Sequence, residues 1–310
     1  MREYLSRSMS SVNRNKVNGM LAEIEFRRHI QSLGYGDHVS VGGWVARSQR
    51  IAGVSEFGQK VVAIFPETVI PGNEYPPGMR MPDPPTGLHT ICATFHQMGI
   101  HGYYCVPTFG EDGSPSSVVW NAAQLGIPSV TEYRRFPECI DGFESRLRRY
   151  NYLRYHADVS GLPDEHVPEE FTKELLRVSF SNRYFAEVSD IDGILWGKQY
   201  TYPIEIKEKT AADDRTMGEF FGIDAGPFVK LAFYAAKKGN LHSIFVVREI
   251  EDVESRKLIC WRYITFEVLA QYAGWTPMSG GTNMLGGASH VIKIPKSRFS
   301  ILDTRALQSL

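Results

Sequence analysis

Residues 189–209 decide how the chain folds, and they read Ser-Asp-Ile-Asp-Gly-Ile-Leu-Trp-Gly-Lys-Gln-Tyr-Thr-Tyr-Pro-Ile-Glu-Ile-Lys-Glu-Lys. Two apolar runs flank Gly197 and Lys198, and this pattern predicts a β-hairpin with its turn at those two residues. The first strand is expected to begin near residue 192 and to end at 196, and the second to run from about 200 to 208. A hairpin holds its side chains in fixed relative positions, so its charged residues form a candidate site.

The charged side chains of this hairpin should gather on one of its faces. Side chains alternate between the two faces of a strand, so Glu205 and Lys207 should point one way while Ile204 and Ile206 point the other. Asp192 opens the first strand, and hairpin pairing should bring its carboxylate close to that of Glu205. The ammonium of Lys207 should then lie on the same face.

Two carboxylates beside a lysine are the groups that metal-assisted hydrolysis of a phosphodiester needs. A hard cation such as Mg²⁺ takes oxygen ligands and keeps open positions for water and a substrate phosphate. It lowers the pKa of bound water and offsets the charge that develops in the transition state. Asp192 and Glu205 are the candidate ligands, together with the backbone carbonyl of Ile206. Lys207 is the candidate to orient or deprotonate the attacking water, provided that the cation depresses its pKa.

Asp192 followed by Glu205-Ile206-Lys207 resembles the Asp…Glu-x-Lys signature of the PD-(D/E)XK nuclease superfamily, to which most type II restriction endonucleases belong. The resemblance covers residues 183–249 and is weak elsewhere. Ile191 stands where many members carry a proline. A helix expected over residues 227–238 and a buried strand expected over 241–248 follow the hairpin, in the order that the superfamily core has.

The resemblance implies an α/β fold, with a mixed central β-sheet flanked by helices (a restriction-endonuclease-like core) and an inserted DNA-recognition lobe. Residues 165–310 would form the core, residues 1–40 an arm and a helix that complete it, and residues 41–164 the lobe. The implied function is Mg²⁺-dependent cleavage of double-stranded DNA at a specific sequence by a homodimeric type II restriction enzyme. Such an enzyme works in the cytoplasm of a prokaryote or phage host, in one system with a cognate DNA methyltransferase that is not its physical partner.

Two other functions fit the same residues. A structure-directed repair, recombination or phage-type nuclease would use the same core. A non-catalytic DNA-binding protein would carry Glu205, Lys207 and Lys209 as a solvated charged face with cross-strand pairs. In that second case the segment 89–105 is a candidate zinc site.

This segment contains five residues of the types that bind zinc: His89, Cys92, His96, His101 and Cys105. Zinc sites usually bring their ligands as two close pairs that bracket a loop, and the spacing here lacks that form. The alternative is a buried helix-to-strand unit with incidental histidines.

Further acids are candidates to join the metal site. A helix expected over residues 18–33 carries Glu23 and Glu25, and the N-terminal helix of many restriction-type nucleases offers a glutamate to the metal. The alternative for both is surface charge paired with an arginine at helical spacing. Asp190 would share a face with Asp192 if the strand is regular there. Lys230, on the helix after the hairpin, is interpreted as a surface lysine, with a lysine that faces the site as the alternative.

The most basic region of the chain is expected to be helical, over residues 142–156. It interleaves tyrosines with four arginines: Arg146, Arg148, Arg149 and Arg154. Arginine binds phosphate in a fork and contacts bases, so these side chains are the candidate DNA contacts. The alternative is a solvated helix face with half-buried tyrosines.

Composition sets the remaining bounds. The chain has 310 residues, of which 43% are hydrophobic and 22% charged, values typical of a globular protein. Its formal net charge of −1 argues against a non-specific nucleic-acid coat protein, but a local basic face is compatible with it. No apolar run reaches the length of a membrane span and no secretory signal is visible, so a cytosolic protein with four reduced cysteines is expected.

The expected elements elsewhere are short. Further strands are expected over residues 39–46, 60–65, 261–266 and 291–294, and further helices from 168 onward and over 267–273. Residues 118–125 and 130–136 are expected to form short elements of either type. Residues 1–16 are expected to form a frayed polar arm, and residues 66–87, 211–226 and 278–289 to form loops.

Overall fold

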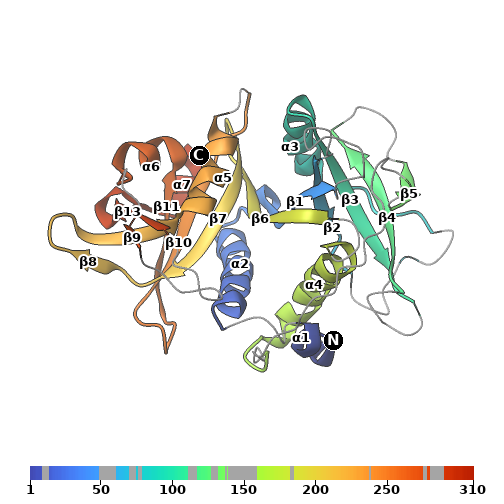
Figure 1. The fold of residues 1–310 in the computed structure, drawn as a ribbon, viewed down its shortest axis with the longest axis horizontal. Helices are drawn as coiled ribbons and strands as arrows, with labels where there is room; N and C mark the ends of the chain where they lie inside the picture. Colours follow the sequence, from blue (N-terminus) through green and yellow to red (C-terminus); the bar gives the residue numbers. More distant parts are fainter. Residues whose placement is uncertain are drawn as a thin grey trace. The chain divides into compact units, whose positions relative to one another are not determined.

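The computed structural model describes residues 1–8, 14–48, 61–69, 75, 79–110, 117–126, 132–136, 138, 159–181, 185–236, 239–274, 278–279 and 290–310. They form a mixed α/β fold with two compact units: unit 1 (residues 1–21 and 41–191) and unit 2 (residues 22–40 and 192–310). Helix α2 (Arg14–Ser32) and strands β1 (Val39–Ser48) and β6 (Phe185–Trp196) each contribute residues to both units (Figure 1). No helix in the described ranges is long and apolar enough to cross a membrane.

Unit 1 is built on a mixed sheet in the order β1-β2-β3-β4-β5. Strand β2 (Val61–Pro66) runs parallel to β3 (Ile100–Thr108), and β4 (Val119–Leu125) and β5 (Tyr133–Arg135) continue the sheet in antiparallel pairs. Its helices are α1 (Arg2–Ser8), α3 (Thr86–Gln97) and α4 (Val167–Ser181), with the 3₁₀ turn Asp164–His166 before α4. Large side chains that include Trp44, Trp120 and Phe180 fill the core between sheet and helices.

Unit 2 is also built on a mixed sheet, in the order β14-β11-β10-β7-β6. Strand β7 (Thr201–Lys209) runs parallel to β10 (Ile244–Ile250) and antiparallel to β6, while β11 (Leu258–Thr265) and β14 (Ser300–Ile301) complete the sheet. A smaller antiparallel sheet contains β8 (Ala212–Asp214), β9 (Gly218–Asp224), β12 (Met278–Ser279) and β13 (His290–Pro295). Its other helices are α5 (Ala225–Ala235), α6 (Phe266–Tyr272) and α7 (Thr304–Ser309), with 3₁₀ turns at Gly36–His38 and Lys296–Arg298.

The central strands of unit 2 are buried on both faces. On one face Ile204, Ile206 and Val246 pack with Phe26 and Ile30 of α2 in one hydrophobic cluster. The opposite face joins a second cluster made of Phe221, Leu231, Phe245, Val247 and Leu269. Every residue of β10 is buried, which confirms the prediction of a strand covered on both sides. Polar side chains on β7 therefore lie in a setting that excludes most water.

Four sequence predictions about these elements are confirmed. The hairpin forms as β6 and β7, a helix follows it as α5, and a buried strand follows that helix as β10. The helix expected at residues 18–33 is present as α2, although it begins four residues earlier. The hairpin connection differs in length from the predicted turn, since four residues, 197–200, join Trp196 to Thr201. The Gly197 N–H donates to the carbonyl of Tyr200 at 2.9 Å and closes this connection.

The N-terminal arm was expected to be frayed, and this prediction is wrong for residues 2–8, which form helix α1. Leu5 in that helix is completely buried. The Arg2 guanidinium donates to the carbonyl oxygens of Val159 and Leu162 at 3.0 and 2.8 Å. One buried leucine and two long-range hydrogen bonds thus hold a segment whose composition is mostly polar.

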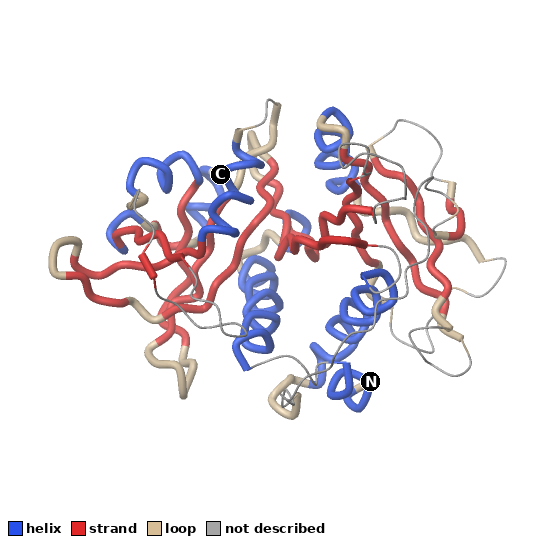
Figure 2. The backbone as a smooth tube through the Cα atoms, in the orientation of Figure 1, coloured by secondary structure: helices blue, strands red, loops and turns tan. Residues whose placement is uncertain are grey.

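The loop expected over residues 211–226 is also a wrong prediction, since most of it forms the β8–β9 hairpin. Gly218 adopts a φ of 75° just after the turn, a conformation that glycine takes without strain. Phe221 and Ile223 alternate with more exposed neighbours and are buried beneath the small sheet. Figure 2 shows this segment in red, as strand. Most of the loop expected at 278–289 lies outside the described residues, as does the helix expected at 142–156.

Candidate active site

The hairpin register brings the two candidate carboxylates together. Gly193 pairs with Ile204, so one more step of the same register sets Asp192 opposite Glu205. The Asp192 Oδ2 accepts a hydrogen bond of 2.8 Å from the backbone N–H of Ile206. Asp192 is 7% exposed and Glu205 is 2% exposed, so both acids are withdrawn from water. The predicted juxtaposition of the two carboxylates is present, and it lies within unit 2.

Two lysines neutralise one of these carboxylates. The Lys207 Nζ lies 2.6 Å from Glu205 Oε1, as the strand alternation predicts. The Lys230 Nζ lies 2.5 Å from the other oxygen, Oε2, and its side chain is only 16% exposed. The interpretation of Lys230 as a surface lysine is therefore wrong, and the alternative of a lysine that faces the site is the one observed. Both oxygens of Glu205 face an ammonium group, whereas Asp192 has no lysine within ion-pair distance among the described residues.

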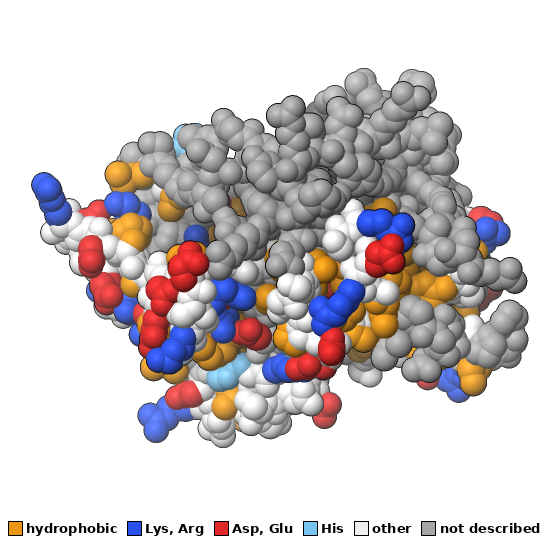
Figure 3. Space-filling view, turned by 90° about the horizontal axis from the view of Figure 1, so that it is seen from below, with side chains coloured by type: hydrophobic (Ala, Val, Ile, Leu, Met, Phe, Trp, Pro, Cys, Tyr) orange, Lys and Arg blue, Asp and Glu red, His pale blue; other side chains and the backbone are white. Residues whose placement is uncertain are grey.

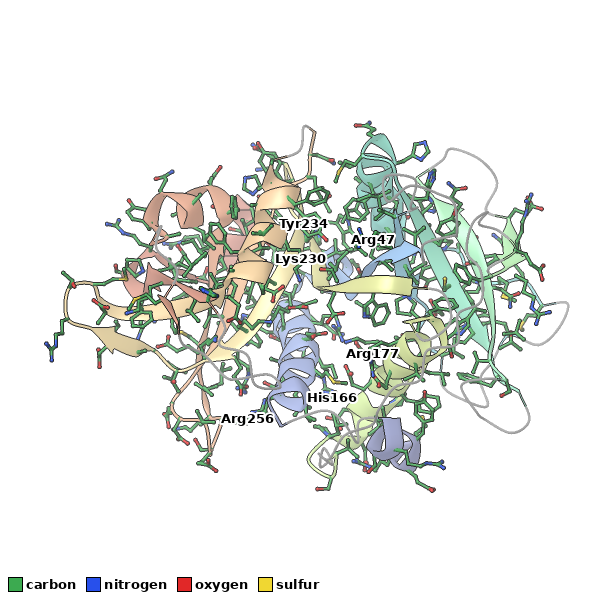
Figure 4. All side chains as sticks on the ribbon, in the orientation of Figure 1. Arg47, His166, Arg177, Lys230, Tyr234 and Arg256 are labelled. Atoms are coloured by element: carbon green, nitrogen blue, oxygen red, sulfur yellow. The ribbon has the colours of Figure 1, made fainter. Side chains whose placement is uncertain are left out.

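Tyr234 completes the side of the site that α5 contributes. It follows Lys230 by four residues, so the two side chains lie on one face of the helix (Figure 4). Tyr234 is 2% exposed, and burial together with the charges of Glu205 and Asp192 raises the pKa of its phenol. The spacing Lys-x₃-Tyr on the helix after the hairpin is the signal that could have pointed to both residues.

The two carboxyl groups have different electrostatics. Burial and the neighbouring charge of Glu205 raise the pKa of Asp192 to about 7, against the opposing effect of Lys207 and Lys230. Burial alone would raise the pKa of Glu205 as well, but the two ammonium groups outweigh it and lower that pKa. Asp192 is thus the carboxyl group whose negative charge is poorly compensated, and a cation bound beside it would supply what is missing.

Lys207 is held in its charged form by its neighbours. Burial favours the neutral amine, but the charges of Glu205 and Asp192 outweigh this and raise the pKa of Lys207. The expected role as a base requires the opposite shift. Beside Glu205 and Asp192, the Lys207 ammonium is suited to orient a water molecule or to stabilise negative charge rather than to accept a proton.

The three further candidate acids, Glu23, Glu25 and Asp190, differ in their surroundings. Glu23 of α2 raises the pKa of both Asp192 and Lys207 through its charge, which indicates that it lies near them. Glu25 instead forms an ion pair with Arg248, with 2.5 Å between Oε2 and Nε. Asp190 precedes Asp192 on β6 and belongs to unit 1. Glu23 is therefore the acid best placed to assist the two carboxylates of the hairpin.

The donor set fits a hard cation that keeps most of its water. No group of three or more His, Cys, Asp or Glu side chains in the described ranges is arranged to hold a metal ion. The site offers two carboxylates, and the backbone N–H of Ile206 donates a hydrogen bond to one of them, Asp192. Asp192 Oδ1 has no protein partner among the described residues, since the one hydrogen bond to this carboxylate reaches Oδ2. Mg²⁺ accepts such a sparse set because it retains several waters, whereas structural zinc demands four protein ligands.

The five candidate zinc ligands lie in α3 and β3, where they make packing contacts. Cys92 is completely buried, and burial raises the pKa of its thiol. The rings of His96 and His101 are 5.3 Å apart, and His101 Nδ1 lies 3.1 Å from the amide nitrogen of Gln124. These contacts are those of a helix packed on a strand. The candidate DNA contacts Arg146, Arg148, Arg149 and Arg154 lie outside the described residues.

Comparison with known proteins adds no assignment to this geometry. No family model matches the chain, and no curated protein or solved structure shows significant similarity to it.

Proposed function

We propose that this protein is a Mg²⁺-dependent nuclease that hydrolyses phosphodiester bonds of double-stranded DNA. The observation that carries the proposal is the pairing of Asp192 with Glu205 across the hairpin, with the Lys207 ammonium on Glu205. Carboxylates are seldom buried side by side unless a cation or a shared proton compensates them. The mixed sheet that carries Glu205, in which β7 runs parallel to β10 and α5 precedes β10, supports the proposal.

Each residue of the site has a distinct task in this proposal. Asp192 and Glu205 would hold the cation, with the Ile206 carbonyl as a further oxygen ligand. When bound, Mg²⁺ supplies an acidified water and positive charge against the phosphate. Lys207 would orient the attacking water and balance negative charge on the phosphate. Lys230 pairs with Glu205 Oε2 from α5 and would yield this oxygen to the cation, and Tyr234 lies on the same face of the helix.

The finer proposal is a type II restriction enzyme that cuts at a specific sequence, works as a homodimer in the cytoplasm and shares its system with a DNA methyltransferase. Acidic and basic side chains of the described residues are mixed on the face drawn in Figure 3. The net charge of the chain is also close to zero. Attraction of DNA would therefore depend on local lysines and arginines rather than on the whole surface.

Incubation with a long, sequence-diverse DNA tests this proposal. The wild-type protein should produce discrete fragments with Mg²⁺ and none with EDTA. Lys207→Ala should lower the initial cleavage rate by about 10² to 10³, the range for loss of a group that stabilises negative charge in the transition state. Lys257→Ala is the matched control, because Lys257 is an exposed lysine that also pairs with a glutamate, Glu251. Its cleavage rate should equal that of the wild type.

Other results of the same experiment point elsewhere. A Mg²⁺-dependent smear of DNA fragments would support nuclease activity but would favour structure-directed cleavage over sequence-specific restriction. The folded protein could instead bind DNA but never cut it, even when branched and modified substrates are included. This result would contradict the nuclease proposal and favour a DNA-binding protein in which the hairpin charges are structural.

Lys230 should compete with the metal for Glu205. Its Nζ stands at Oε2, so an incoming cation must displace it or share the oxygen. We expect Lys230→Met to bind Mg²⁺ or Mn²⁺ about tenfold more tightly than wild type, since an ion pair of this kind is worth about 1 kcal/mol or more. Titration calorimetry measures this affinity, with Lys257→Met as control. Equal or weaker binding by Lys230→Met would show that the lysine supports the metal site instead.

A further inference from the structure

A row of charged side chains extends from the acids along β7. Glu205, Lys207 and Lys209 alternate with Ile206 and Glu208, which point to the other face, so the three charged side chains lie on one side of the strand. In the parallel pair with β10 they lie beside Phe245, Val247 and Glu249. The row therefore begins at the candidate metal ligands and ends at the last residue of β7.

The two lysines of this row differ in their partners. Lys207 is neutralised by Glu205. Lys209 is half-buried, yet within the part of the chain that the structure describes it has no ion pair and no hydrogen bond through its ammonium. Glu249, its neighbour across the strand pair, is committed to Arg262 and Lys296.

An unpaired ammonium in this position is unfavourable by itself. Burial lowers the pKa of Lys209, and the charge of Asp224 offsets this only in part, while the smaller effect of Lys207 lowers the pKa further. Most other described lysines of unit 2 have a carboxylate partner within 4 Å, and the exception besides Lys209 is Lys198, which is exposed in the hairpin connection. A bound anion would compensate Lys209 in the way that carboxylates compensate the others.

The spacing of the two lysines suits a polynucleotide. Residues two apart on a strand are separated by about 6.6 Å, and their side chains leave the strand side by side. Consecutive phosphates on one strand of a nucleic acid lie at a similar separation. A phosphate held at the acids and Lys207 would therefore place a neighbouring phosphate of the same strand within reach of Lys209.

We propose that Lys209 forms a second phosphate subsite, which binds the phosphodiester next to the scissile one on the same strand. This inference rests on the proposed nuclease function and specifies its substrate as a strand with at least two consecutive phosphates. Lys209 contacts substrate without touching the reacting phosphate, so it contributes to binding and to positioning of the strand.

Binding of a labelled DNA duplex, followed by fluorescence anisotropy in EDTA at several salt concentrations, tests the subsite. Loss of one phosphate contact should reduce the slope of log affinity against log salt by about 0.9. We expect this reduction for Lys209→Ala and Lys209→Gln, together with a 3- to 10-fold weaker affinity in low salt. Lys209→Arg should retain most of the affinity, and the control Lys198→Ala should keep the wild-type slope. Thermal unfolding of each variant confirms that it is folded.

Cleavage of two substrates gives a second readout. Bis(p-nitrophenyl) phosphate has a single phosphate, so wild type and Lys209→Ala should hydrolyse it with equal kcat/KM. An oligonucleotide duplex should show a lower kcat/KM for Lys209→Ala, mainly through KM. If wild type binds and cuts DNA while Lys209→Ala and Lys209→Gln behave like Lys198→Ala, the proposal of a Lys209 subsite is wrong, but the proposed nuclease function is supported. If wild type neither binds nor cuts, both the subsite and the proposed function are wrong.

Discussion

Asp192→Asn should abolish cleavage and, in EDTA at pH 8, make the protein more stable than wild type. The carboxylate is 7% exposed and faces Glu205, so the folded protein holds its negative charge unfavourably. Asparagine has nearly the same shape and can still accept the hydrogen bond from the Ile206 N–H. We expect a cleavage rate at least about 10³-fold lower, because several kcal/mol of charge stabilisation depend on the cation.

The gain in stability should depend on pH. The folded-state pKa of Asp192 is raised to about 7, above its ordinary value of 3.8, so the folded protein binds a proton more readily than the unfolded chain. This contribution favours folding at pH 4 and is lost as the pH rises through 7. Asparagine cannot ionise, so the variant should exceed wild type by about 2 to 4 kcal/mol at pH 8 and by little at pH 4.

Thermal unfolding with and without Mg²⁺ separates the electrostatic effect from a general change in packing. Mg²⁺ should raise the Tm of wild type, since it binds only the folded state, and should leave Asp192→Asn unchanged. Lys257→Ala provides the control with an intact site. A variant less stable than wild type at every pH would indicate that Asp192 is a structural acid supported by its neighbours.

The placement of the hairpin acids on one face could be predicted, because it depends on strand alternation and on an even number of residues in the turn. Glu205 and Lys207 share a face in any regular strand, and an even number of turn residues keeps Asp192 on it. The exact partner could not be predicted. A two-residue turn at 197–198 would set Asp192 opposite Pro203, whereas the four-residue connection sets it opposite Glu205. The hydrogen bond between the Gly197 N–H and the Tyr200 carbonyl sets the length of this connection. The residue types in the turn do not reveal that length.

The contribution of α5 could not be predicted because it depends on how the helix is rotated against the sheet. Lys230 and Tyr234 turn toward Glu205, while Val229 and Phe233 are 64% and 41% exposed. A helix that exposes a valine and a phenylalanine and buries a lysine contradicts the usual hydrophobic pattern. Such a local contradiction is expected at a functional site, where chemistry rather than packing selects the residue.

Arg248→Met should destabilise the protein by about 3 kcal/mol, since it breaks a buried ion network in unit 2. The side chains of Arg248 and Glu208 are each 8% exposed, and Nη1 lies 2.8 Å from Glu208 Oε2. The same guanidinium binds Glu25 of α2 and donates at 3.0 Å to the backbone carbonyl of Arg256. Methionine has an unbranched side chain that fills space but carries no charge.

The expected loss is limited by the other partners of the network. Glu208 keeps two hydrogen bonds of 2.8 Å from Arg256, and Glu25 is exposed enough to turn toward water. Urea unfolding measures the loss, with Lys257→Ala as the control. Lys257 also pairs with a glutamate, but these two side chains are 69% and 48% exposed, so the control should cost at most about 0.5 kcal/mol.

A double variant shows whether the loss comes from the unpaired acid. Arg248→Met combined with Glu208→Gln should be less destabilised than the sum of the two single changes, because no uncompensated carboxylate remains. Glu208 follows Lys207 on β7 and points to the opposite face. The ion network therefore stabilises β7 from the face that does not carry the candidate site. Arg248→Met should therefore weaken the fold yet retain the Mg²⁺-dependent rise in Tm. A loss below about 1 kcal/mol would show that the network contributes no more than an exposed ion pair does.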